Sequence, residues 1–338
     1  MHTGDLRIWL ALALASSLGG CSSDDPCSRA TCLETLPWQG MGSTVDADEA
    51  EISTYACGAS GLDGREVLYH FNVDELGFLA AEAKPIEGAT APSLHLLGAP
   101  SGEACLDGGL VRAGGLLTPG EYWLVVDSNA GAEGAYELRV GLTTETDLEA
   151  QAMQQAAAHD ALAVMGAAWE RRDTERFEYV VTDFSLHSGL EREWIFDLTS
   201  EELLFHLHVA HGRGSNEAFM DTAYPPAFSN VPGSHLSSLG VMKSGEAYEG
   251  AYGSSFRIDG IEPDLNDNVR DRAIVMHPWE GSRPEFVTEH GEVQPTWGCP
   301  ALDDRVAPMV ADLLHDGVLM FFWHPEWRDH STYLSAAQ

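Results

Sequence analysis

A cysteine and a histidine in the C-terminal half lie in settings that suit nucleophilic catalysis. Cys299 belongs to the segment TWGCP at 296–300, just before a predicted helix, and His277 ends a short apolar run. A free thiol has a pKa near 8.5, so only a few per cent is thiolate at pH 7. A neighbouring His⁺ or a helix N-terminus stabilises the thiolate and lowers that pKa. The pattern predicts a thiol nucleophile at Cys299 with His277 as its imidazole partner; the alternative is that both are structural.

The residues around the nucleophile suggest supporting roles. Gly298 permits a tight turn and frees N–H groups near the sulfur, and such groups are donors to a tetrahedral oxyanion. The hydroxyl of Thr296 is expected either to bind the imidazole or to stabilise the turn. Trp297 is expected either to shape a substrate groove or, as the more common role of tryptophan, to pack in the core.

The elements that position these residues are mainly β. Residues 179–323 contain strand-like runs at 179–184, 193–198, 203–209 and 318–323. A late helix is predicted from Val306 to Leu314 with Gly317 as its stop, and the 278–295 segment between His277 and the TWGCP turn is predicted to be a polar loop. A helix is predicted over 147–171, with Thr146 and Glu149 forming a capping box.

The first half is expected to be a separate all-β domain. Short runs at 67–71, 94–97, 122–126 and 135–140 alternate with Gly and Pro turns, which is typical of a β-sandwich. The predicted fold class is mainly β, with a sandwich over 33–145 and a β-rich catalytic domain with a few helices over 146–338. Because the catalytic motifs all lie beyond residue 205, we expect a fragment beginning near residue 147 to retain catalysis.

Length and charge limit the function classes. A chain of 338 residues predicts two domains, and 18 Lys+Arg against 53 Asp+Glu give a net charge of −35. Such an acidic chain repels phosphate backbones, which argues against nucleic-acid binding. The hydrophobic content of 44% with nine tryptophans argues against disorder.

The N-terminus is typical of an export signal. Residues 1–20 contain a short apolar run followed by small residues, and Leu18-Gly19-Gly20-Cys21 resembles the lipobox of bacterial lipoproteins. That resemblance implies cleavage before Cys21, its lipidation and a membrane anchor, with 21–32 as a tether. Ser22 after the cysteine favours the outer membrane, facing the periplasm. The alternative is an ordinary signal peptide with a chance cysteine.

Removing the lipidated Cys21 leaves five cysteines, an odd number for an exported protein. The economical pairing joins Cys27 to Cys32 and Cys57 to Cys105, which leaves Cys299 free. Other pairings among the four stay open. A zinc site is less favoured, because exported thiols tend to pair and the spacings are irregular.

Several segments of the second half carry a family resemblance. The stretches 228–240, 274–277 (IVMH) and 297–301 (WGCPA), together with 209–212 and 265–268, resemble the YkuD-type catalytic domain of murein L,D-transpeptidases. The resemblance spans about 178–323, with the motifs in order. It implies a β-rich catalytic domain that acts on the stem peptides of peptidoglycan without a cofactor.

The resemblance also implies roles for individual residues. Cys299 attacks the carbonyl of the third stem residue, His277 is base and then acid, terminal D-alanine leaves, and a side-chain amine of another stem resolves the thioester. The N–H groups of Gly298 and Cys299 contribute to the oxyanion hole. Better-known members place Ser-His-Gly before the cysteine and an arginine after it, and this chain does not. The substrate-binding candidates are therefore Ser237, Ser238, Arg270, Arg272 and Trp297.

The first domain resembles the bacterial pre-peptidase C-terminal β-sandwich through 117–127 and 134–138. Some members bind calcium, and Asp46, Asp48 and Asp127 are candidate ligands, although solvated turn acids are the favoured interpretation. We predict no metal site. The cluster His206, His208 and His211 lacks an adjacent acid, and the 264–268 segment lacks the Gly and Glu of an EF-hand.

Three functions remain open at this point. The first is an envelope L,D-transpeptidase. The second is an L,D-carboxypeptidase or hydrolase with the same nucleophile, in which water resolves the thioester. The third is an inert wall-tethering lipoprotein, against which the presence of both His277 and Cys299 argues.

Overall fold

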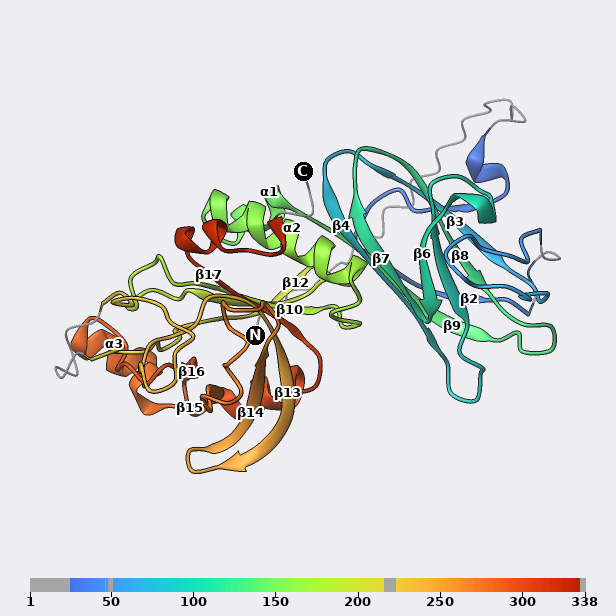
Figure 1. Cartoon of the computed structure of the whole chain (residues 1–338). Helices are drawn as coiled ribbons and strands as arrows, with labels where there is room; N and C mark the ends of the chain where they lie inside the picture. Colours follow the sequence, from blue (N-terminus) through green and yellow to red (C-terminus); the bar gives the residue numbers. More distant parts are fainter. Residues whose placement is uncertain (1–24, 46, 48–50, 216–222, 335–338) are drawn as a thin grey trace, which may run out of the picture.

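The computed structural model describes residues 25–45, 47, 51–215 and 223–334. The predicted signal peptide, the lipidation site Cys21 and the candidate calcium ligands Asp46 and Asp48 lie outside these residues. Within the described part, no helix combines the length and the apolar character that crossing a membrane requires. The chain is mainly β, as predicted, with a sandwich and a second β-rich domain (Figure 1).

The sandwich consists of two sheets that face each other across an apolar interior. One sheet has the strand order β1-β3-β8-β5-β6, and the other has the order β2-β9-β4-β7. The strands of the first sheet are β1 (Thr31–Cys32), β3 (Val67–Val73), β8 (Gly120–Asp127), β5 (Ser93–Leu97) and β6 (Cys105–Leu110). Those of the second are β2 (Trp38–Ser43), β9 (Ala135–Thr144), β4 (Gly77–Pro85) and β7 (Arg112–Leu117). Short 3-10 helices, η1 (Pro26–Ser28) and η2 (Gly102–Ala104), precede β1 and β6.

The second domain is built on a mixed eight-stranded sheet in the order β12-β11-β10-β17-β13-β14-β15-β16. At its centre β17 (Leu319–Trp323) is buried along its whole length and pairs parallel to β10 (Glu178–Asp183) and antiparallel to β13 (Gly240–Gly250). The remaining strands are β11 (Glu193–Asp197), β12 (Glu202–Leu207), β14 (Gly253–Gly260), β15 (Val275–Pro278) and β16 (Ala301–Leu302).

The helices differ from the sequence expectation in two places. The helix expected over 147–171 is two helices, α1 (Glu145–Ala150) and α2 (Gln155–Glu170), and the capping box is formed by Thr144 with Asp147 rather than by Thr146 with Glu149. The segment 278–295, expected to be a loop, contains η3 (Glu280–Ser282) and α3 (Pro284–His290). The late helix is α4 (Ala307–Leu314), followed beyond β17 by η4 (Pro325–Asp329).

The sandwich and the second domain share a core. In β4, Leu79 and Ala81 face the sandwich interior, whereas Phe78 and Ala80 belong to the core of the second domain. The ring of Phe78 meets that of Trp169 on α2 edge-on, with centroids 6.0 Å apart. Helix α2 therefore lies between the β4–β7 edge of the sandwich and the sheet of the second domain (Figure 1). Burial on both sides explains the imperfect apolar periodicity of its sequence.

A buried carboxylate reinforces this interface. Asp107 on β6 accepts hydrogen bonds from the Trp169 indole (2.9 Å) and from the backbone N–H of Gly114 (2.8 Å), and it pairs with Arg172 just after α2. Glycine is required at two of the contact points, because a Cβ on Gly166 would lie 2.9 Å from Leu116 and one on Gly114 would lie 2.8 Å from a backbone oxygen. The two domains are thus fitted to each other rather than merely linked.

Candidate functional site

Strand pairing brings the candidate nucleophile and base together. His277 lies on β15, and in the parallel pairing with β16 it is the partner of Ala301. Cys299, two residues before Ala301, is accordingly placed beside the start of β15, where the backbone N–H of Val275 interacts with its sulfur. The sulfur also lies 3.8 Å from the carbonyl oxygen of Ala273.

The imidazole of His277 is held in one tautomer. Its Nδ1 lies 2.8 Å from the carbonyl oxygen of Pro278, and since a carbonyl only accepts, Nδ1 carries the proton. The neutral ring then has its lone pair on Nε2. Burial lowers the pKa of His277, and the Pro278 hydrogen bond opposes this only in part. The ring is therefore a neutral base at neutral pH.

Cys299 is a thiol in the resting state. Burial raises its pKa, whereas the Val275 N–H and the charge of Arg272 act in the opposite direction. These directions do not favour a resting thiolate stabilised by His⁺, because burial disfavours the charged form of both groups. The arrangement instead suits transfer of the thiol proton to the imidazole during attack, as in general-base catalysis.

The TWGCP turn is closed by a side chain. The Thr296 hydroxyl donates to the carbonyl of Cys299 (2.7 Å) and accepts from the N–H of Gly298 (3.2 Å). Thr296 therefore stabilises the turn and does not orient the imidazole. The N–H of Gly298 is engaged in this bond, which is at odds with its expected place in an oxyanion hole. Gly298 has φ +115°, and a Cβ there would lie 2.7 Å from Ile274 and from the carbonyl of Leu236, so only glycine fits.

The segment 228–240 is a scaffold for this turn. The buried hydroxyl of Ser237 accepts from the N–H of Gly212 (3.0 Å) and donates to the carbonyl of Gly298 (3.3 Å). The hydroxyl of Ser238 donates to the carbonyl of Ser229 (3.1 Å). Both serines, proposed from sequence as substrate-binding, are thus used to fix backbone around the nucleophile.

The two candidate arginines differ in position. Arg272 is half-buried, and its guanidinium donates to four groups of one segment: the Ser229 and Leu236 carbonyls and the Ser234 and Ser238 hydroxyls. It ties this segment to the turn before β15 and places a positive charge near Cys299.

Arg270 lies apart from this arrangement. It forms ion pairs with Asp259 and Glu246 at the surface, which raise its pKa. Its proposed role in substrate binding is therefore not supported.

Trp297 is exposed rather than in the core. Its side chain is 61% accessible and stacks on His235, with ring centroids 4.6 Å apart. The guanidinium of Arg213 lies over the indole at 5.8 Å from its centroid. Next to the nucleophile, this flat exposed surface suits contact with a substrate. The other tryptophans near the C-terminus, Trp323 and Trp327, are buried.

One positioning group was missed by sequence reasoning. Arg192 is fully buried and donates to the carbonyl of Val209 (3.0 Å) and to Nδ1 of His211 (2.7 Å), and burial lowers its pKa to about 9. The carbonyl of His211 accepts from the N–H of Thr296 (2.8 Å), so Arg192 supports the strand segment on which the nucleophile turn rests. An isolated arginine beside a strand gives no such signal in the sequence.

One protein family matches the second half of the chain. The family described as "L,D-transpeptidase catalytic domain" matches residues 149–323, which is more than half of the chain. The chain belongs to this family. His277 and Cys299 both lie within the matched residues. Helix α2 begins close to the N-terminal boundary of this L,D-transpeptidase domain.

Several solved structures are similar to parts of the chain. The chain is similar to the pre-peptidase C-terminal domain of a collagenase from Bacillus anthracis, at 20% identity and TM-score 0.25, covering 33% of this chain and 93% of that one. An L,D-transpeptidase from Xylanimonas cellulosilytica is similar at 10% identity and TM-score 0.26, covering 46% and 68%. A search of curated proteins found no significant match.

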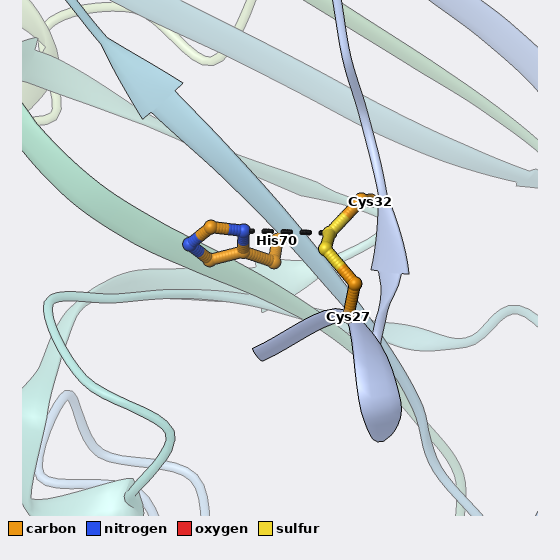
Figure 2. Close-up of side chains that lie close together, drawn as sticks. All are labelled: Cys27, Cys32 and His70. Carbon is orange, nitrogen blue, oxygen red and sulfur yellow. Dashed lines mark hydrogen bonds between the residues drawn. A yellow bond between two sulfur atoms is a disulfide. The ribbon is translucent and has the colours of Figure 1, made fainter. Parts of the chain in front are cut away.

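Two Cys–His groups in the sandwich resemble metal sites but are occupied by disulfides. Among the described residues, Cys27, Cys32 and His70 form one group, and Cys57, Cys105 and His95 form the other. The cysteines of each group are joined to each other, with Nδ1 of His70 3.6 Å from the sulfur of Cys32 (Figure 2). A disulfide offers no thiolate ligand. His206, His208 and His211 contact Glu191, Gly189 and Arg192 respectively and form no such group.

The remaining acids of the sandwich also differ from expectation. Asp127 is fully buried, accepting from the Tyr55 hydroxyl (2.6 Å), and burial raises its pKa to about 6; it is not a solvated turn acid. A cavity of about 1380 Å³ also lies in this domain beside Glu66 and Trp123. It includes neither Cys299 nor His277, so cavity size alone does not locate the catalytic centre.

Thiol labelling tests the cysteine assignment. With both disulfides closed, Cys299 is the free cysteine of the described residues. We expect a neutral alkylating reagent to modify the folded protein at Cys299 only, and slowly below neutral pH, because the resting group is a thiol with a raised pKa. Peptide mapping by mass spectrometry reads the site. Labelling of Cys57 or Cys105 in the folded protein would contradict the pairing.

Proposed function

We propose that this chain is a peptidoglycan L,D-transpeptidase that acts through a thioester on Cys299. The observation that carries the proposal is the tautomer of His277, whose protonated Nδ1 leaves Nε2 as a base, on a strand that pairs with the segment directly after the free thiol Cys299. Membership of the L,D-transpeptidase family supports the same chemistry. The buried, neutral state of both groups fits a reaction in which charge develops only as the proton moves.

The proposed reaction has two halves. In the first, the Cys299 sulfur attacks the carbonyl of the third stem residue while Nε2 of His277 takes the thiol proton. The proton then passes to the nitrogen of the leaving D-alanine as the peptide bond breaks and the thioester forms. In the second half, the side-chain amine of another stem attacks the thioester, His277 accepts the amine proton, and the thiol is released with a new amide bond.

Substrate recognition is proposed for the exposed surface around the turn. Trp297 supplies a flat apolar contact, and Arg213 above it is the candidate to bind a stem carboxylate, which a chain of net charge −35 otherwise repels. Arg272 donates to the 229–238 segment. We also propose that the mature chain begins at Cys21 and is lipid-anchored in the cell envelope at the outer membrane.

Muropeptide analysis tests transfer against hydrolysis. Purified tetrapeptide muropeptides are incubated with the disulfide-intact protein, and products are identified by mass spectrometry, with Cys299→Ala as the control. We expect dimers joined between two third-position residues, because an amine bound next to the thioester has a high effective concentration that bulk water lacks. Tripeptides accumulating without dimers at high acceptor concentration would make the chain an L,D-carboxypeptidase instead.

A further inference from the structure

An aromatic side chain covers the imidazole of His277. Strands β13 and β14 form a long hairpin (Figure 1), in which Gly250 pairs with Gly253 and two residues, Ala251 and Tyr252, make the connection. The ring of Tyr252 stacks on the imidazole of His277, with centroids 4.5 Å apart and planes 21° apart. Nothing in the sequence places Tyr252 here, since it lies 25 positions before His277.

A second aromatic ring completes the enclosure. Trp279 meets Tyr252 edge-on with centroids 5.7 Å apart, and it meets His277 edge-on at 6.0 Å. Its indole N–H donates to the carbonyl of Gln294 (2.9 Å), which fixes Trp279 in place. The imidazole is therefore held by the Pro278 carbonyl at one edge and by two rings around it.

The exposure of the two stacked rings is unequal. His277 is 5% accessible, whereas Tyr252 is 58% accessible. One part of the tyrosine thus shields the imidazole, and the rest faces solvent. A tyrosine that served only the hairpin would not need to lie on this ring, because the connection is already made by the Gly250–Gly253 pair.

We propose that Tyr252 is a positioning residue for His277, which covers one face of the imidazole, excludes water from it and keeps the ring in the plane set by Pro278. The proposal rests on the proposed function of His277 as the base. Tyr252 acts through His277 and is not assigned contact with the reacting atoms.

Tyr252 has two opposing effects on the pKa of the imidazole. A π-face stabilises a protonated ring, which would raise its pKa. Exclusion of water destabilises the protonated ring and lowers its pKa, and burial is the larger cause of the shift at His277. Removing Tyr252 should therefore raise the pKa of His277 toward its ordinary value.

Charged and titratable side chains lie on the elements around His277. No charged side chain of the described residues contributes to its pKa shift, which is caused by burial and by Pro278. The charged residues on the elements that pair or pack with β15 are Arg257, Asp259 and Asp312, and the titratable or charged residues directly next to β15 and β16 are Arg272, Glu280, Cys299 and Asp303. These residues are unchanged in every variant below except the one that removes the thiol.

An NMR titration tests the proposal without relying on activity. In full-length Cys299→Ala protein with labelled histidine, the His277 resonance is assigned by its loss in His277→Gln and followed with pH. We expect Tyr252→Ala to raise the His277 pKa by about half to one unit, since it opens one face of the ring to water. Tyr252→Phe, which keeps the stacked ring, should titrate with the parent. Tyr224→Ala is the matched control, because that tyrosine is 54% accessible and contacts a different histidine, His187.

A pH–rate profile gives the second readout. With Cys299 present, the acidic limb of the pH–rate profile, which reports deprotonation of His277, should move to higher pH in Tyr252→Ala. The kcat of this variant should fall about tenfold, with a smaller change in KM. An unmoved His277 titration in Tyr252→Ala, with the melting temperature kept, would overturn the proposal.

Different results would contradict the proposed function of His277 and the proposed role of Tyr252. If His277→Gln leaves turnover intact, the proposed function of His277 fails whatever the titration shows. If His277→Gln abolishes turnover while Tyr252→Ala keeps the parent titration and profile, only the role of Tyr252 fails.

Discussion

Replacing Cys299 with alanine is expected to abolish turnover. No thioester can form without the sulfur, and loss of a nucleophile costs about 10³–10⁶-fold in rate. The fold should persist, because the Cys299 side chain is partly exposed and its contact with the Ala273 carbonyl is long, at 3.8 Å. Mass spectrometry of products and of the intact protein gives the readout, and circular dichroism checks the fold.

His277→Gln is the companion variant. We expect a loss of about 10²–10⁴-fold, since both thiol deprotonation and protonation of the leaving amine suffer. A β-lactam of the carbapenem class, which the family resemblance implies as a ligand, should add its mass to the parent and not to Cys299→Ala. Full turnover by Cys299→Ala would refute the proposed mechanism outright.

Removing the sandwich is expected to destabilise the catalytic half severely. A fragment beginning at residue 145 would expose Trp169 and the β7-facing side of α2, and it would leave the Trp169 indole without Asp107. Truncating one buried aromatic side chain already costs about 3–5 kcal/mol, against a total stability of about 5–15 kcal/mol. The structure therefore argues against the sequence-based expectation that such a fragment retains catalysis.

Solubility, cooperative melting and muropeptide turnover of the 145–338 fragment are the measurements. In the full chain, Trp169→Ala should lower the melting temperature strongly. Trp297→Ala, at a tryptophan that is 61% accessible, is the matched control and should leave the melting temperature nearly unchanged. A soluble fragment that melts cooperatively and turns over like the full chain would show that the shared core is dispensable.

The sequence predicted those elements whose patterns are local. The runs at 67–71, 94–97 and 122–126 are strands, and the short run that carries His277 is strand β15, so these local patterns were predicted correctly. Strand β4 gave no such signal, because GFLAAEAKP contains three Ala with one Glu and one Lys, residues that are uncommon in strands. It is stable as a strand because it is buried on both faces, by residues from two domains.

Roles that depend on spatial neighbours could not be predicted from sequence. Arg270 and Arg272 are two positions apart and chemically identical, yet one pairs with surface acids and the other anchors the 229–238 segment. Likewise the pKa of Cys299 depends on how deeply the turn is buried, which the TWGCP letters do not encode. Spacing along the chain predicted the participants but not their protonation states.

The shared core also has a consequence for the order in which the chain is made. Strands β4, β6 and β7, which supply Phe78, Asp107 and Leu116, all precede α2 in the sequence. The whole sequence that forms the surface on which α2 packs is therefore made before α2 itself, and domains generally fold from the N-terminus onward. A sandwich that folds first would offer α2 a finished surface, and the catalytic half would fold against it.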